Sequence, residues 1–246
     1  MHPRADELAR RAQQAPKVVS LAAALRSDSV ALIAEVKRRS PSKGAIAPGL
    51  DASTQARAYA QGGAAAISVL TEPDHFGGSE DDLVSVRSAV SVPALKKDFH
   101  VQPIQLVEAR ALGASAALLI MRALSPERFR ELMDCGRALD LELLVEVRDE
   151  AELERAVEGG ATMIGVNNRD LETLLIDGTT AERIVPKIPR SIVAVAESGI
   201  QSRDDVTRYA GFGADAVLVG SSISAAPDPV AATRALAGVP RRGRGD

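Results

Sequence analysis

Eight short apolar runs, each followed by a segment of helical periodicity, constrain the fold of this chain most. The runs are expected to be strands at 31–36, 65–70, 93–99, 116–121, 142–147, 163–168, 192–197 and 216–221. Amphipathic segments are expected to be helices around 54–62, 80–89, 103–112, 126–139, 149–159, 179–187, 203–211 and 228–237. The runs are apolar nearly throughout, which is typical of parallel strands covered on both faces. Strands that alternate with helices predict a parallel sheet with helical crossovers.

A weak internal repeat indicates that this sheet closes on itself. A Gly-Ala pair followed by apolar residues begins at Gly63, Gly113, Gly160 and Gly213, with spacings of 50, 47 and 53 residues, or two strand–helix units each. Four such pairs and a length of 246 residues favour an α/β fold of the closed (β/α)8 TIM-barrel type over an open doubly wound sheet. We therefore expect a single domain over 1–246, with an N-terminal helical extension over 1–30 and a disordered basic tail over 240–246.

Composition excludes several function classes. Aromatic residues make up 2% of the chain, with no Trp, which argues against a surface that stacks nucleic-acid bases. The net charge of -3 gives no sign of a polyanionic partner, and the single cysteine, Cys135, cannot form an internal disulfide. The N-terminus lacks the apolar core of a signal peptide, and no apolar run is long enough to span a membrane. We expect a cytoplasmic protein that binds a small molecule.

Charged residues gather at the carboxyl ends of the odd-numbered expected strands, the end of a (β/α)8 barrel that holds the active site. They are Glu35 and Lys37 on the first run, Lys97 on the third, Glu146 on the fifth and Glu197 on the seventh, while Asn167 ends the sixth. Because side chains alternate along a strand, Glu35 and Lys37 face the same way. Any one of these residues alone is more typical of a solvated strand end or a structural salt bridge. Their convergence favours acid–base chemistry.

Two small-residue turns suggest a phosphate site. They are AESGI at 196–200, which contains Ser198 and Gly199, and LVGSSI at 218–223, which contains Gly220 and Ser221 and is expected to lead into a short helix. Barrels often bind phosphate after the seventh and eighth strands, and Lys37 would supply an opposing charge. The alternative is a tight turn that needs small residues for packing.

Two of the four Phe residues, Phe76 and Phe99, lie in loops at the same end of the expected barrel. They suit either an apolar ring of a substrate or the packing of the core or of a lid. We expect His75 and His100, in the same loops, to be solvated, because no second His or acid lies at a metal-binding spacing.

Seven stretches between Ala31 and Ile223 resemble a known family in sequence and in order: IAEVKRRSPSKG, SVLTEPDHFGGS, LKKDF, LLVEV, IGVNNRDL, VAESGI and ADAVLVGSSI. The chain resembles indole-3-glycerol phosphate synthase of tryptophan biosynthesis. The resemblance implies a barrel lyase without cofactor or metal that converts 1-(2-carboxyphenylamino)-1-deoxyribulose 5-phosphate to indole-3-glycerol phosphate, releasing carbon dioxide and water. A phosphosugar isomerase such as phosphoribosylanthranilate isomerase would lack the E-x-K-x-x-S-P element and the lysine of KDF. A non-catalytic barrel would lack some of the acid–base residues.

The resemblance also implies roles for individual residues. Lys97 would be the general acid of ring closure, and Glu146 would serve the dehydration, with Lys37 and Glu35 as a competing assignment. Asn167 and Glu197 would bind substrate hydroxyls or orient the lysines. The anthranilate side and its apolar wall would comprise Ser40, Pro41, Arg169, Phe76, Phe99, Leu119 and Leu171, and the phosphate would meet Lys37, Ser198, Gly199, Gly220 and Ser221. Loose association with other enzymes of the tryptophan pathway is also expected.

Overall fold

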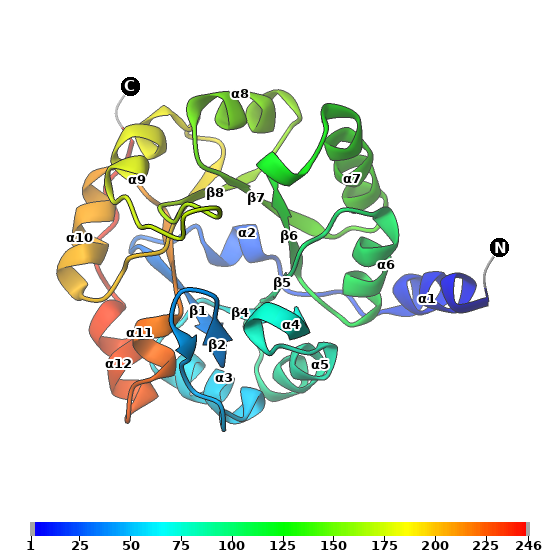
Figure 1. Cartoon of the computed structure of the whole chain (residues 1–246), viewed down its shortest axis with the longest axis horizontal. Helices are drawn as coiled ribbons and strands as arrows, with labels where there is room; N and C mark the ends of the chain where they lie inside the picture. Colours follow the sequence, from blue (N-terminus) through cyan, green and yellow to red (C-terminus); the bar gives the residue numbers. More distant parts are fainter. Residues whose placement is uncertain (1–2, 245–246) are drawn as a thin grey trace.

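A closed barrel of eight parallel strands forms the centre of the computed structural model, which describes residues 3–244 (Figure 1). The strands follow one another around the barrel in the order β1-β10-β9-β8-β7-β6-β5-β4. Their bounds are β1 (Ala31–Val36), β4 (Ala66–Leu70), β5 (Ala94–Lys97), β6 (Ala116–Ile120), β7 (Glu142–Val147), β8 (Met163–Asn167), β9 (Val193–Glu197) and β10 (Ala216–Val219). Each falls within an expected run, so the (β/α)8 prediction is confirmed.

The crossover helices surround the barrel and begin at residues that cap them. Asp149 and Ser202 each accept a backbone N–H of the first helical turn through the side chain, and Ser125 does so in front of a proline. The helices are α3 (Ala52–Gln61), α5 (Glu80–Ala89), α6 (Pro103–Ala111), α7 (Pro126–Ala138), α8 (Glu150–Glu158), α9 (Thr179–Ile184), α10 (Arg203–Gly211) and α12 (Pro229–Leu236). None of the helices within residues 3–244 is both long and apolar enough to cross a membrane.

The strands divide their side chains between two separate cores. One set, which includes Ile33, Leu95 and Leu144, fills the interior of the barrel, whereas alternate residues such as Ala34 and Val145 pack against the helices. Because side chains alternate along a strand, the inward set continues at the carboxyl ends into the charged residues of the barrel mouth.

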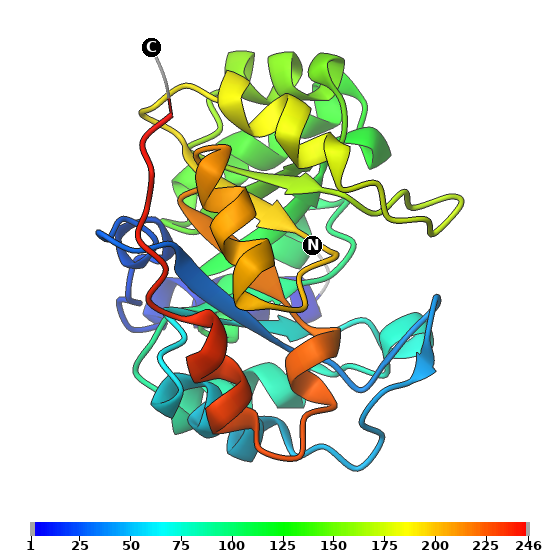
Figure 2. The same ribbon diagram turned by 90° about the vertical axis from the view of Figure 1, so that its left-hand side faces the viewer.

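Part of the expected N-terminal helical extension, the short helix α2 (Leu21–Ala24), closes the other end of the barrel, while α1 (Pro3–Gln14) projects outward beside α6. The α2 segment inserts fully buried Leu21 and Leu25 among the interior side chains. The carboxylate of Glu142 accepts the backbone N–H of Ala22 at 2.9 Å, which ties α2 to β7. In Figure 2 this blue segment lies on the left, opposite the β2–β3 hairpin on the right.

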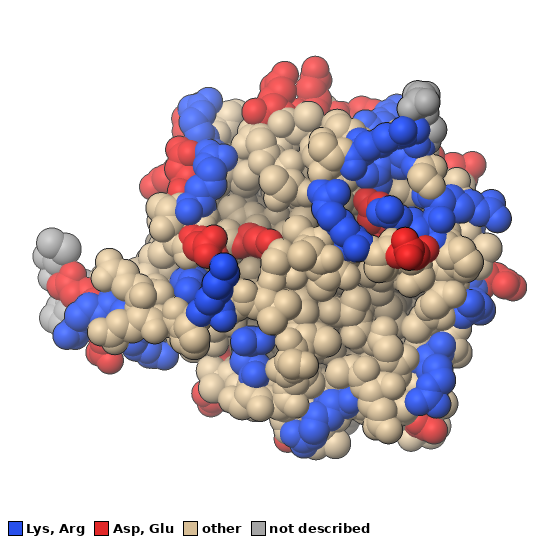
Figure 3. Space-filling view, turned by 180° about the vertical axis from the view of Figure 1, so that it is seen from behind, with Lys and Arg blue, Asp and Glu red and all other residues tan. Residues whose placement is uncertain are grey.

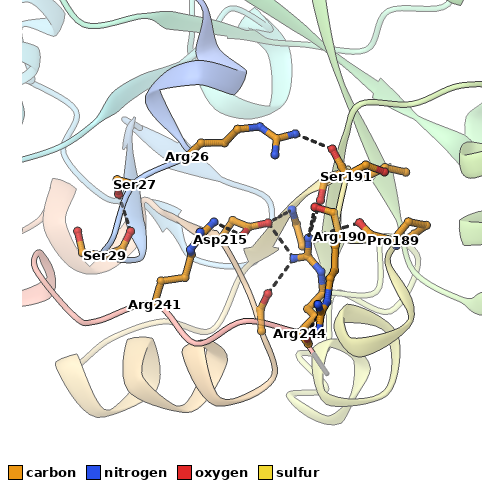
Figure 4. Close-up of polar contacts among 12 residues, drawn as sticks. Arg26, Ser27, Ser29, Pro189, Arg190, Ser191, Asp215, Arg241 and Arg244 are labelled. Atoms are coloured by element: carbon orange, nitrogen blue, oxygen red, sulfur yellow. Dashed lines mark hydrogen bonds and ion pairs between the residues drawn. The ribbon is translucent and has the colours of Figure 1, made fainter. Parts of the chain in front are cut away.

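The C-terminal segment is ordered where disorder is expected (Figure 4). The Arg244 guanidinium is buried and donates to the Asp215 carboxylate at 2.8 Å and to the Ile192 carbonyl at 2.7 Å. Arg241 donates to the other oxygen of Asp215 at 2.9 Å. The prediction of disorder is therefore wrong for residues 240–244. Their basic side chains suggest a solvated tail, but Arg241 and Arg244 pair with the carboxylate of Asp215 and with backbone carbonyls. Residues 245–246 lie outside the described residues.

Basic side chains gather on one side of this end of the barrel (Figure 3).

Short elements cover the mouth of the barrel. They are the hairpin of β2 (Arg39–Ser40) and β3 (Gly44–Ala45), α4 (Pro73–Phe76), α11 (Ser221–Ser224) and the 3-10 turn η1 (Met121–Ala123), while a second 3-10 turn, η2 (Val185–Lys187), extends α9. Helix α11 is the short helix expected after the last strand. The hairpin is held at its base by Arg38, whose guanidinium donates to Asp82 of α5 at 2.8 Å and to the Leu50 carbonyl at 3.1 Å. The loop of Ser40 and Pro41 is thereby fixed beside the barrel mouth.

Candidate active site

Four of the predicted residues meet at the ends of β5, β7, β8 and β9. The Lys97 ammonium lies 3.5 Å from Oε2 of Glu146 and 3.7 Å from Oε2 of Glu197. The other oxygen of Glu146 accepts the side-chain N–H of Asn167 at 3.1 Å. One lysine thus stands between two carboxylates, one of which is oriented by an amide.

Glu35 and Lys37 form a second acid–base pair at the end of β1. The Lys37 ammonium lies 2.7 Å from Oε1 of Glu35, and the Ser68 hydroxyl donates to Oε2 at 3.4 Å. Lys37 also stands 5.8 Å from the centre of the Phe76 ring, a cation–π distance. As the alternation of side chains predicts, both residues face the mouth.

Burial and mutual charge set the protonation of this cluster. Burial raises the pKa of Glu197 to about 8, opposed by Lys97 and aided by the like charges of Glu146 and Glu35. Burial alone would lower the pKa of Lys97, but the carboxylates of Glu146, Glu197 and Glu35 outweigh it and raise that pKa. Burial would likewise raise the pKa of Glu35, but Lys37 and Lys97 outweigh it and lower that pKa. At pH 7 the cluster therefore contains a cationic Lys97 beside a neutral Glu197.

The cluster opens into a cavity of about 400 Å³, a size typical of small-molecule sites. One side is apolar, with the rings of Phe76 and Phe99 6.3 Å apart. The predicted residues along its wall are Glu35, Lys37, Ser40, Pro41, Phe76, Lys97, Phe99, Glu146, Asn167, Arg169, Leu171, Ser198 and Ser221. Glu197 is 2% exposed and lies behind Lys97 instead of lining the cavity.

A smaller cavity of about 150 Å³ adjoins the first at the ends of β9 and β10. Its lining includes all the predicted phosphate residues, namely Lys37, Ser198, Gly199, Gly220 and Ser221, together with Lys43. Ser198 and Gly199 both adopt positive φ, 67° and 85°, which bends the chain sharply after β9. Two lysines therefore face a turn of small residues, an arrangement suited to an anion.

Comparison with known proteins identifies the family. A sequence profile described as indole-3-glycerol phosphate synthase matches residues 1–236. The chain belongs to the indole-3-glycerol phosphate synthase family. This family consists of carboxy-lyases of tryptophan biosynthesis that act on a phosphorylated small molecule. Within residues 3–244, no group of three or more His, Cys, Asp or Glu side chains is placed to hold a metal ion.

Similar proteins agree with this assignment. The indole-3-glycerol phosphate synthase of Mycolicibacterium vanbaalenii is 49% identical over 231 residues, covering 94% of this chain and 85% of that protein. The synthase of Streptomyces griseus is 51% identical over 231 residues, covering 94% and 86%. A solved structure of thiamine phosphate pyrophosphorylase from Pyrococcus furiosus has a TM-score of 0.63 at 18% identity, covering 86% of this chain and 95% of that one, and supports the fold alone.

One residue assigned from the resemblance to indole-3-glycerol phosphate synthase lies elsewhere. Leu119 is fully buried in the outer core between the barrel and the helices. Its neighbours Leu118 and Ile120 line the cavity instead, because alternation turns them inward. The prediction for Leu119 is therefore wrong by one position.

Several cavity residues escape the sequence reasoning. Leu70 and Glu72 lie in the wall together with His75, which is exposed, as expected for a solvated loop histidine. The Glu72 side chain caps α4 by accepting three backbone N–H groups, and E-P-D at the helix start is the signal that predicts such a cap. His100 is 2% exposed, not solvated, and its Nδ1 lies 2.8 Å from the Leu118 carbonyl.

Proposed function

We propose that this chain converts 1-(2-carboxyphenylamino)-1-deoxyribulose 5-phosphate to indole-3-glycerol phosphate, with Lys97 as the acid of ring closure. The single observation that supports this most is the Lys97 ammonium, held 3.5 Å and 3.7 Å from two carboxylates at the floor of a cavity with one apolar side. The reaction needs a cation near the ketose carbonyl, an apolar surface for the aromatic ring and a phosphate site. The two adjoining cavities contain suitable residues for each.

Ring closure comes first in this proposal. As the aromatic carbon attacks the ketose carbonyl, negative charge develops on the carbonyl oxygen, and Lys97 neutralises it by giving up a proton. The surrounding carboxylates raise the Lys97 pKa, so that Lys97 is fully protonated before the attack. Loss of carbon dioxide then leaves the indoline ring.

Dehydration completes the sequence: the hydroxyl takes up a proton and leaves as water, the indoline ring gives up a proton, and we propose Glu146 as the group that transfers a proton in this step. Glu146 lines the cavity, and Asn167 fixes one of its oxygens by a hydrogen bond of 3.1 Å. The competing assignment is Lys37 with Glu35, which lines the same cavity from β1. The two assignments can be distinguished by mutation, because the reaction should stop after decarboxylation only in the variant that lacks the group needed for dehydration.

The substrate would lie across both cavities. The phosphate would meet Lys37 and the turns of Ser198, Gly199, Gly220 and Ser221, and the anthranilate ring would pack against Phe76, Phe99 and Leu171. Arg169 would pair with the carboxylate. Its guanidinium already donates to the Leu174 carbonyl at 2.7 Å, which fixes the direction of the side chain.

Turnover of the anilino-deoxyribulose phosphate, followed by indole fluorescence, tests the proposal. We expect the wild-type protein to form product and Lys97→Ala to lose about 10²–10⁴-fold in kcat, the usual cost of removing one acid–base group. Lys187→Ala, on the exposed surface, is the matched control and should retain activity. No turnover by the wild-type protein would contradict the function, and full activity of Lys97→Ala would contradict the role of Lys97.

We also infer a cytoplasmic location and loose association with other tryptophan-pathway enzymes. Membership of a biosynthetic family supports both inferences. Co-sedimentation with purified pathway enzymes, with and without salt, tests the association, and a concentration-independent sedimentation coefficient would contradict it.

A further inference from the structure

Gly165 occupies an inward position on β8, between Met163 and Asn167. It lies within the strand and pairs with Glu146 of β7 and Val195 of β9. Gly165 is absent from the glycines with positive φ, so an L-residue fits its backbone conformation. The backbone therefore gives no reason for a glycine at this position.

The reason lies in the side chain that fills the vacant space. A Cβ atom at Gly165 would lie 2.0 Å from Oε1 and 3.1 Å from Cδ of Glu197. The next neighbour, Leu144, would be at an ordinary contact distance of 3.6 Å. A methyl group here thus overlaps the carboxyl group of Glu197 and little else.

This position of Glu197 matters for the reacting lysine. With Oε1 over Gly165, Oε2 lies 3.7 Å from the Lys97 ammonium. Oε1 is buried and has no hydrogen-bond partner among the described residues. The space over Gly165 therefore decides where Oε1 lies, while Lys97 and Glu146 interact with the carboxyl group as a whole. Gly220 similarly leaves space for the carboxyl group of Glu35, since a Cβ at Gly220 would lie 2.6 Å from Oε1 of Glu35.

We propose that Gly165 is a positioning residue for the reaction, because its missing side chain provides the space in which Glu197 lies behind Lys97 and orients the Lys97 ammonium. Gly165 acts through Glu197 and need not touch the substrate. The inference rests on the proposed role of Lys97.

A double-mutant cycle over wild type, Gly165→Ala, Glu197→Ala and the double variant tests this inference. We expect Gly165→Ala to lower kcat/KM by about 10²-fold, the typical cost of a small misplacement at a catalytic group. In the Glu197→Ala background the obstructing carboxyl group is gone, so Gly165→Ala should change kcat/KM by less than about twofold. Thermal unfolding should follow the same pattern, with a lower Tm for Gly165→Ala and no further loss in the double variant.

The control is Val193→Ile, which adds one methyl group at a buried inward position of β9, away from the acids. It should retain wild-type kcat and KM. Equal losses from Gly165→Ala in both backgrounds, or activity of Gly165→Ala within about twofold of wild type, would overturn the inference.

Direct titration of the Glu197 carboxyl group by NMR adds a readout independent of turnover. Burial, against Lys97 and with Glu146 and Glu35, raises its pKa to about 8 in the wild-type protein. Displacement of the carboxyl group from its buried space in Gly165→Ala should lower that pKa, whereas Val193→Ile should leave it at the wild-type value. An unchanged pKa contradicts the inference. If the wild-type protein fails to turn over the substrate, the proposed function fails, while the titration and the Tm cycle still decide whether Gly165 positions Glu197.

Discussion

Glu197 is a buried acid whose pKa is raised to about 8 from an ordinary value of 4.5. Between those two pH values the folded protein keeps this proton and the unfolded chain releases it. The folded state then binds more protons, so the contribution of Glu197 to the free energy of unfolding falls as pH rises through this window. We expect urea unfolding to show a steeper loss of stability from pH 5 to pH 8 for wild type than for Glu197→Gln. Parallel curves for the two proteins would contradict the buried, neutral Glu197.

Glu146 offers a test of the order of chemical steps. Glu146→Gln keeps an oxygen for the hydrogen bond from Asn167 but cannot take up and release a proton as a carboxyl group does. We expect indole formation to fall by about 10²–10⁴-fold while release of carbon dioxide falls less, because decarboxylation precedes the step that needs this acid. Measurement of both products in one reaction checks this. If Lys37→Met, not Glu146→Gln, releases excess carbon dioxide, dehydration belongs to the Lys37–Glu35 pair.

At the scale of single residues, the sequence predicts which way a side chain faces when a charged residue distinguishes the two faces of its strand. On β5, alternation turns Lys97 to the mouth and Lys96 outward, and Lys96 is indeed buried on the outer side, near Asp98 and Glu108. On β6 the sequence AALLI is apolar on both faces, so nothing in it distinguishes an inward Leu118 from an outward Leu119. The error at Leu119 follows from that symmetry.

Helix α2 acts as a plug, and its contribution can be measured apart from catalysis. Leu21 is fully buried in the interior core at the end of the barrel opposite the active site. We expect Leu21→Ala to lower the free energy of unfolding by about 2–5 kcal/mol, the usual cost of a core cavity, with KM unchanged. Val19→Ala is the control, since Val19 is 50% exposed and should cost little. A large change in KM for Leu21→Ala would indicate coupling between the plug and the active site.

At the scale of elements, the long strands and helices follow directly from periodicity, whereas the short ones depend on contacts distant in sequence. The β2–β3 hairpin has only two residues in each strand. Its position is set by the pairing of Arg38 with Asp82, a residue 44 positions away. Local periodicity contains no record of such a partner.

The C-terminal segment is tied to the barrel through Arg244. Arg244 supplies buried hydrogen bonds to Asp215 and to backbone carbonyls, so we expect Arg244→Ala to lower the free energy of unfolding by about 2–3 kcal/mol, in line with hydrogen bonds to charged groups. Chemical denaturation at neutral pH measures this loss, with exposed Arg242→Ala as the control. An unchanged midpoint for Arg244→Ala would mean that the segment does not contribute to stability.

Across the whole molecule, the tail is also where sequence reasoning fails, for a physical reason. A run such as RRGRGD has the composition of a disordered segment, but the order of its residues 241–244 depends on distant partners such as Asp215, which lies 29 positions before Arg244, and the Ile192 carbonyl. Gly213, at φ +90°, adds space that a side chain would remove, since its Cβ would lie 2.3 Å from Cγ of Arg244. Composition shows that the segment is charged, but it does not show the distant residues and the space that bind its side chains.

The adjacent lysines of β5 have a consequence for the register that this strand adopts during folding. A slip of this strand by one residue would turn Lys96 and Asp98 into the mouth and send Lys97 outward, toward Glu108 of α6. Both arrangements place a lysine beside acids on each side of the strand, so charge pairing alone distinguishes them poorly. Specific activity, counted per folded barrel, would therefore report the fraction of molecules whose fifth strand has the correct alignment.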